Sequence, residues 1–176
     1  NGGIVTMDDL RIYAPKWQQS VSTKLFGGNT TLHTTPLPSS GCVLTFILNI
    51  LEGYKFHENS FEYHRGNKLI YHRIVEAFKF GFGMRTKLGD EISVEVVEAV
   101  GELMDVDFAN HIRTFINDEQ TFNDTEYYKA NGSVSLDHGT GHISILAPNG
   151  DAVALTSTIN SMQVCHALIN DEIFPI

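Results

Sequence analysis

Residues 139–160 read GTGHISILAPNGDAVALTSTIN, and this stretch decides the fold of its part of the chain. Two runs of alternating polar and apolar residues, 142–146 and 153–157, are typical of half-buried β-strands. Between the two runs, a loop over 148–150 ends in a glycine, which can adopt the left-handed conformation that such loops require. The stretch therefore predicts a β-hairpin.

The loop length also predicts the register of this hairpin. With a three-residue loop Ala147 pairs with Asp151, and four apolar side chains then share one face of the hairpin. These side chains are Ile143, Ile145, Val153 and Leu155. A two-residue loop would divide them between both faces, so burial favours the first register. The same register places Thr140 opposite Thr158, with Asn160 just beyond.

A pair of threonines at a strand end can support nucleophilic chemistry. A threonine hydroxyl is a weak nucleophile without a general base, and an N-terminal threonine carries such a base in its own α-amine. This amine has a pKa of roughly 8, so much of it is neutral at physiological pH. Thr140 is internal and would gain the amine only if the bond to Gly139 were cleaved, a place where glycine permits strained backbone. Spacing alone favours ordinary strand-forming threonines.

Several segments, in a fixed order, resemble the γ-glutamyltranspeptidase (glutathione hydrolase) family. The start of the family's small subunit is similar to residues 139–144, 149–153 and 156–160. Its large subunit is similar to residues 3–10, 38–41, 47–54, 71–78 and 85–90. The resemblance thus extends over nearly the whole chain up to Asn160.

The resemblance implies an α+β fold of the N-terminal-nucleophile hydrolase class, an αββα sandwich that is incomplete in this chain. Residues 1–139 would form the C-terminal part of the large-subunit region. Residues 140–176 would form the start of the small-subunit region with the catalytic threonine. Together they would make one structural domain.

The resemblance also implies an activity, that of a γ-glutamyltransferase and glutathione hydrolase that first cleaves itself between Gly139 and Thr140. Thr140 would attack the γ-carbonyl of glutathione or another γ-glutamyl donor, and the ester would pass to water or to an amino-acid or dipeptide acceptor. Thr158 would orient the nucleophile and contact the donor, while Asn160 and Glu172 would bind the donor's α-amino-acid part. No cofactor or metal is implied, and the two subunits would be a heterodimer from one precursor.

Two alternatives stay open. The stretch between Asn160 and Glu172 is shorter here than the corresponding stretch of the family. The Ser-Ser pair and the Gly-Gly oxyanion hole that the family has further on are not found in these 176 residues. A truncated, catalytically inactive homologue with a binding role, or with no independent role, is one alternative. A related self-processing amidase that acts on another acyl donor is the other.

Composition narrows the class of partner. Hydrophobic residues make up 42% of the 176 residues, which supports a core, and the formal net charge of −9 argues against a nucleic-acid surface. The sequence contains no apolar run of about 18 residues, so it predicts no membrane span within these residues. Sequons at Asn29, Asn123 and Asn131 fit a secretory route. The resemblance accordingly implies a protein that is secreted or lies on the extracellular face of the plasma membrane, with any anchor upstream of this chain.

The cysteines and histidines give weaker indications. Cys42 and Cys165 could pair, although the apolar surroundings of Cys42 favour a buried free thiol. The eight histidines form no pattern typical of metal ligands. His142 is interpreted as structural and His138 as part of an exposed loop.

Periodicity predicts the other elements. Helices are expected over 43–51, capped by Ser39 or Ser40 and buried nearly all round, then over 69–86 and over 107–116. The second of these would bury one face made of Ile70, Ile74, Ala77, Phe78 and Phe82. A strand and turn are expected over 4–13. Residues 118–137 are expected to be a protruding, mobile surface loop that leads to the cleavage site.

Overall fold

The computed structural model describes residues 4–57, 60, 66–89, 93–132 and 140–158. The chain divides into two compact units. The larger unit is Trp17–Val134, and the smaller unit combines Asn1–Lys16 with Ser135–Ile176.

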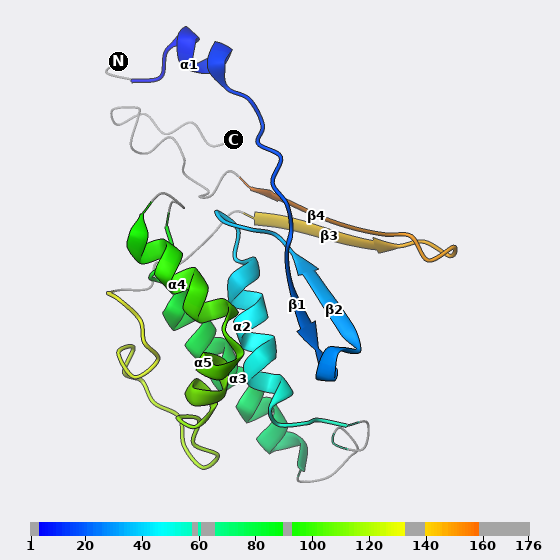
Figure 1. Ribbon diagram of the computed structural model, residues 1–176, viewed down its shortest axis with the longest axis vertical. Helices are drawn as coiled ribbons and strands as arrows, with labels where there is room; N and C mark the ends of the chain where they lie inside the picture. Colours follow the sequence, from blue (N-terminus) through cyan, green and yellow to red (C-terminus); the bar gives the residue numbers. More distant parts are fainter. Residues whose placement is uncertain (1–3, 58–59, 61–65, 90–92, 133–139, 159–176) are drawn as a thin grey trace. The chain divides into compact units, whose positions relative to one another are not determined.

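Helix α2 (Gly41–Glu52) is the centre of the larger unit. It contacts helices α3 (Gly66–Arg85), α4 (Val94–Met104) and α5 (Val106–Arg113), and the antiparallel strands β1 (Val21–Leu25) and β2 (Thr30–Thr34). Figure 1 shows α2, in cyan, between the β1–β2 hairpin and the other helices. A short 3₁₀ turn, η1 (Phe26–Gly28), joins the two strands. The predicted burial of this helix is confirmed, because Phe46 and Ile50 are fully buried and most of its other side chains are buried too.

Helix α3 confirms the second predicted helix but buries a different face. Its buried apolar side chains are Ile70, Ala77, Phe80 and Met84. The predicted core residues Phe78 and Phe82 are 45% and 50% exposed, so that part of the prediction is wrong. The reason is close packing at two glycines. A Cβ on Gly81 would lie 2.6 Å from Ile47 of α2, and a Cβ on Gly83 would overlap backbone of the 117–131 segment.

Two helices lie where the sequence pattern predicted none. Residues 4–13 were expected to hold a strand, but α1 (Met7–Ile12) forms there because Thr6 and Asp9 make a capping box. The Thr6 amide donates to Asp9 Oδ2 at 2.7 Å, and the Asp9 amide donates back to Thr6 Oγ1 at 3.3 Å. Helix α4 begins after Ser93, whose hydroxyl accepts from the Val96 amide at 3.3 Å. The third predicted helix is confirmed as α5, although it ends at Arg113.

Strands β3 (Thr140–Leu146) and β4 (Ala152–Thr158) form the hairpin of the smaller unit in the predicted register. Ile143 pairs with Leu155 and Ile145 pairs with Val153. The turn is closed by the Ala147 amide, which donates to the Asp151 carbonyl at 2.8 Å, and Gly150 takes a φ of +91°. The three-residue loop and its left-handed glycine are therefore confirmed.

The segment after α5 differs from the expected protruding loop. Its described part, residues 118–132, is joined to α3 by an ion pair in which Arg73 Nη2 lies 2.6 Å from Asp118 Oδ2, and by further hydrogen bonds along the helix. These residues form a surface loop without helix or strand, as predicted, but the loop does not protrude, because it lies on α3, where Arg73 and Gly83 contact it. The rest of the predicted loop, 133–137, lies outside the described residues.

Candidate functional site

The hairpin brings the two predicted threonines together. Thr140 and Thr158 are cross-strand partners, and Thr140 Oγ1 donates a hydrogen bond to Thr158 Oγ1 at 3.0 Å. Directly opposite residues in an antiparallel pair have Cβ atoms only about 5 Å apart, which brings two short hydroxyl side chains within hydrogen-bond reach. The register that the loop imposes therefore restrains the Thr140 hydroxyl from the opposite strand.

His142 extends this row of polar groups along the same face. Its Nδ1 lies 2.7 Å from Thr156 Oγ1, and its Nε2 lies 2.9 Å from Ser144 Oγ. Both ring nitrogens thus have hydroxyl partners on the hairpin. The imidazole joins β3 to β4 two residue pairs inside the threonines, in line with the structural role expected for it.

The remaining predicted site residues are distributed as follows. Gly139, Asn160 and Glu172 lie outside the described residues, so their proposed roles stay predictions. The sequon asparagines are all exposed, namely Asn29, Asn123 and Asn131.

Cys42 is buried in α2 as a free thiol, and this burial raises its pKa. Its interpretation as a buried free thiol is confirmed. The other cysteine, Cys165, lies outside the described residues, and so does His138.

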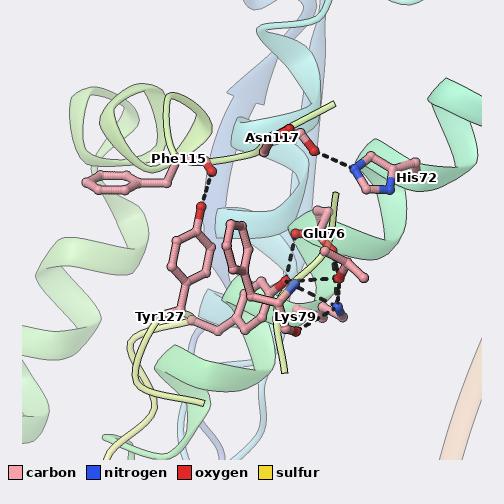
Figure 2. Close-up of polar contacts among 9 residues, drawn as sticks. His72, Glu76, Lys79, Phe115, Asn117 and Tyr127 are labelled. Atoms are coloured by element: carbon pink, nitrogen blue, oxygen red, sulfur yellow. Dashed lines mark hydrogen bonds and ion pairs between the residues drawn. The ribbon is translucent and has the colours of Figure 1, made fainter. Parts of the chain in front are cut away.

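Sequence reasoning missed a polar cluster on α3, which Figure 2 shows around Glu76 and Lys79. The Glu76 side chain is 1% exposed. Its Oε1 accepts from Thr121 Oγ1 at 2.6 Å and from Lys79 Nζ at 3.1 Å, and its Oε2 accepts from the Tyr128 hydroxyl at 2.8 Å. The apolar face predicted for this helix includes neither Glu76 nor Lys79. Gly83, four residues after Lys79, is a sequence feature that can indicate close packing against a helix.

The environment keeps the Glu76 carboxylate ionised. Burial by itself raises the pKa of Glu76, but hydrogen bonds from Thr121, Tyr128 and Lys79, together with the Lys79 charge, bring that pKa below its ordinary value. The hydrogen bonds from Arg73 likewise lower the pKa of Asp118. Both carboxylates of this region are therefore charged at neutral pH.

Two other features are absent from the residues that the structure describes. No cluster of three or more histidine, cysteine, aspartate or glutamate side chains there could hold a metal ion. Among the described helices, none is both long and apolar enough to span a membrane.

The chain is similar in sequence to known proteins. A family model described as gamma-glutamyltranspeptidase matches residues 1–164. Scoloptoxin SSD14 of Scolopendra dehaani is 38% identical over 159 residues, which cover 90% of this chain and 27% of the relative. Glutathione hydrolase 5 proenzyme of Rattus norvegicus is 36% identical over 161 residues, which cover 91% of this chain and 28% of the relative.

A solved structure is similar as well. The crystal structure of Helicobacter pylori gamma-glutamyltranspeptidase superposes with a TM-score of 0.59 at 26% identity, over 74% of this chain and 35% of that chain. The helices and small antiparallel sheets described here are thus part of an α+β fold of the N-terminal-nucleophile hydrolase class. Within that class, the chain belongs to the γ-glutamyltranspeptidase family. It spans little more than a quarter of the length of the curated relatives named above.

Proposed function

We propose that this chain carries the nucleophile of a γ-glutamyltransferase and glutathione hydrolase, and that Thr140 is this nucleophile. The observation that carries the proposal is the 3.0 Å hydrogen bond between Thr140 Oγ1 and Thr158 Oγ1. It sits at the end of a hairpin in a chain of the γ-glutamyltranspeptidase family. Family membership gives the reaction class, and the hydrogen bond gives the hydroxyl that could perform the reaction.

The first step would be self-cleavage. Thr140 Oγ1 would bond to the carbonyl carbon of Gly139, the peptide C–N bond would break, and the nitrogen would take up the hydroxyl proton. Water would then hydrolyse the ester, leaving a carboxylate on Gly139 and a free α-amine on Thr140. The amine is the general base that the hydroxyl needs.

Turnover would use the same oxygen. The α-amine would accept the hydroxyl proton while Thr140 Oγ1 attacks the γ-carbonyl of glutathione or a related γ-glutamyl donor. The departing amine would receive that proton, and the γ-glutamyl ester would pass to water or to the amine of an amino-acid or dipeptide acceptor. Thr158 would orient the hydroxyl, and Asn160 and Glu172 would hold the α-amino-acid part of the donor.

Precursor processing and secretion belong to the same proposal. The rat relative is named a proenzyme, which supports a precursor that is cut into large and small subunits. The three exposed sequon asparagines support glycosylation on a secretory route, with the protein secreted or on the extracellular face of the plasma membrane.

Intact-mass measurement of the purified full precursor tests the proposal. We expect two fragments whose junction is the Gly139–Thr140 bond, none in Thr140→Ala, and slower formation of the same fragments in Thr140→Ser, which keeps a hydroxyl. The cleaved protein should then release anilide from a γ-glutamyl anilide. A precursor that stays whole would favour the inactive homologue, and cleavage without activity on γ-glutamyl anilide would favour an amidase for another acyl donor.

A further inference from the structure

Residues 117–131, here called the docked segment, follow α3 from its first turns to its C-terminal end. The His72 ring contacts the Asn117 carbonyl at 2.7 Å, and Arg73 makes two hydrogen bonds to the Asp118 carboxylate, at 2.8 and 2.6 Å. At the far end of the helix, the Asn131 amide donates to Thr86 Oγ1 at 2.7 Å. The contacts occur in the same order along α3 and along the docked segment. They extend over about 21 Å of helix, given a rise of about 1.5 Å per residue.

The Glu76 cluster lies in the middle of this contact, and it pairs every polar group that it buries (Figure 2). Besides its bond to Glu76, the Tyr128 hydroxyl accepts from the Phe122 amide at 3.0 Å. Lys79 Nζ donates to the Tyr128 hydroxyl at 3.1 Å and to Thr121. The Glu76 carboxylate and the Lys79 ammonium on α3 therefore each contact the docked segment at two places, Thr121 and Tyr128.

Backbone contact fixes the segment further towards its end. An added Cβ on Gly83 would lie 1.8 Å from the Tyr128 carbonyl oxygen, so the segment rests directly on the helix at this glycine. Thr86 Oγ1 donates a hydrogen bond to the Gly83 carbonyl at 2.6 Å. This bond orients the same hydroxyl oxygen that accepts the hydrogen bond from the Asn131 amide. Asn131 is thus the last described attachment of the segment to α3.

The attachment point lies close in sequence to the proposed cleavage site. Eight peptide units separate Asn131 from Gly139. A fully extended chain of that length spans at most about 28 Å. The docked segment is the last part of the chain before the bond between Gly139 and Thr140 whose contacts are described.

The chemistry of the cluster favours positioning over bulk stabilisation. A buried carboxylate loses its hydration, and replacing buried ion pairs with apolar groups of similar volume is often neutral or stabilising. The two directed hydrogen bonds that the segment donates to Glu76, from Thr121 and Tyr128, by contrast, favour one arrangement of the segment. Phe80 and Phe122 already supply apolar contacts to the two neighbouring tyrosines.

We propose that Glu76, Lys79 and Tyr128 are positioning residues for self-processing: they hold the docked segment on α3 and so set the point from which the chain reaches the Gly139–Thr140 bond. They also keep the docked segment on α3 after the cut. This inference rests on the proposed function, because it requires that the bond is cleaved.

The test compares two adjacent tyrosines in the full precursor. Tyr128→Phe removes the hydroxyl that joins Glu76 to Phe122, while Tyr127→Phe removes a hydroxyl that bonds to the Phe115 carbonyl and not to α3. Cleavage is followed by intact mass after synthesis, turnover is measured on fully cleaved protein, and hydrogen exchange of residues 119–131 is measured in a Thr140→Ala background. We expect Tyr128→Phe to slow cleavage by at least about tenfold and to speed exchange, because the lost hydroxyl donates to Glu76 and accepts from Phe122 and Lys79. Turnover after cleavage should stay within about twofold for both variants.

Three outcomes would overturn the inference. An unchanged cleavage rate in Tyr128→Phe, with the wild-type precursor cut normally, would refute the positioning role alone. A parallel loss of cleavage, turnover and melting temperature would show a merely structural role. A wild-type precursor that is never cut would refute the proposed function first and the positioning role with it. Glu76→Gln, expected to act like Tyr128→Phe, and Glu98→Gln on the exposed face of α4 provide a second matched pair.

Discussion

At the scale of single residues, the candidate site depends on one hydrogen bond between two threonine hydroxyls. Thr158→Val keeps the shape of the side chain but removes the partner of Thr140 Oγ1. Loss of one neutral hydrogen bond corresponds to about 1 kcal/mol, so we expect cleavage at the Gly139–Thr140 bond, and later turnover, to slow by about five- to tenfold. Timed intact-mass analysis and a γ-glutamyl anilide assay would measure both rates. Thr158→Ser is the control, since it keeps the hydroxyl, and equal rates in the Val and Ser variants would contradict the orienting role.

The charge of Glu76 gives a second prediction at this scale. Because the pKa of Glu76 is lower in the folded protein than in the unfolded chain, its stabilising contribution is present above the unfolded pKa and is lost as the pH falls through the folded pKa. We expect Glu76→Gln to lower the melting temperature most at neutral pH, and to differ less from wild type below about pH 4. Melting curves by circular dichroism between neutral and acidic pH would show this. The exposed Glu98→Gln should give a small shift at every pH, and a Glu76→Gln difference that does not shrink in acid would argue against an ionised Glu76.

At the scale of elements, the docked segment can lie on α3 because Gly83 has no Cβ. Gly83→Ala would place a Cβ 1.8 Å from the Tyr128 carbonyl oxygen, which is backbone and cannot rotate away. We expect a loss of about 2–3 kcal/mol in the free energy of unfolding, typical of an overpacked position. Gly101→Ala in α4 is the matched control, because nothing lies within 4 Å of its added Cβ and alanine favours a helix interior by up to about 1 kcal/mol. Chemical denaturation of both variants would give the two free energies of unfolding. An unchanged value for Gly83→Ala would contradict the close packing of the docked segment on α3.

The elements that the sequence could predict are those in which local pattern and burial agree. The hairpin is one, since its loop chemistry and the alternation of Ile143 and Ile145 require the same register. Helix α4 was missed because its sequence, VEVVEAVGELM, is rich in valine and holds a glycine, both poor helix formers, so the Ser93 cap and burial of Leu103 against the core decide its conformation. Helix α1 was missed although Thr6 and Asp9 carry the capping-box spacing.

The candidate site was predicted in part for a similar reason. Thr140 and Thr158 are 18 residues apart, but the short loop makes their contact a local property of the hairpin. The Glu76 cluster joins residues that lie 45 to 52 positions apart, Thr121 and Tyr128 being brought to α3 by long-range packing. No periodicity within α3 marks Glu76 as buried, because the surface that covers it comes from another part of the chain.

At the scale of the whole molecule, the two units differ in how their apolar residues are covered. Ile50 of α2 is fully buried, whereas Ile145 of β3 is 54% exposed. The other apolar side chains on that face of the hairpin, Ile143, Val153 and Leu155, are 52%, 60% and 60% exposed. A two-stranded hairpin with an open apolar face is only marginally stable in water. In a chain that spans about a quarter of the length of its relatives, we therefore expect the stability of the 176-residue chain to reside in the helical unit.

A matched pair of isoleucine substitutions tests this division. In the 176-residue chain Ile50→Ala should cost about 2–5 kcal/mol of unfolding free energy, because it leaves a cavity in the core. Ile145→Ala removes the same atoms from a half-exposed site and should cost well under 1 kcal/mol. Urea denaturation followed by circular dichroism gives both values, and hydrogen exchange should be much faster in β3 and β4 than in α2. Equal losses in the two variants would mean that the apolar face of the hairpin is packed in solution, and that Thr140 is held in a stable sheet before any cleavage takes place.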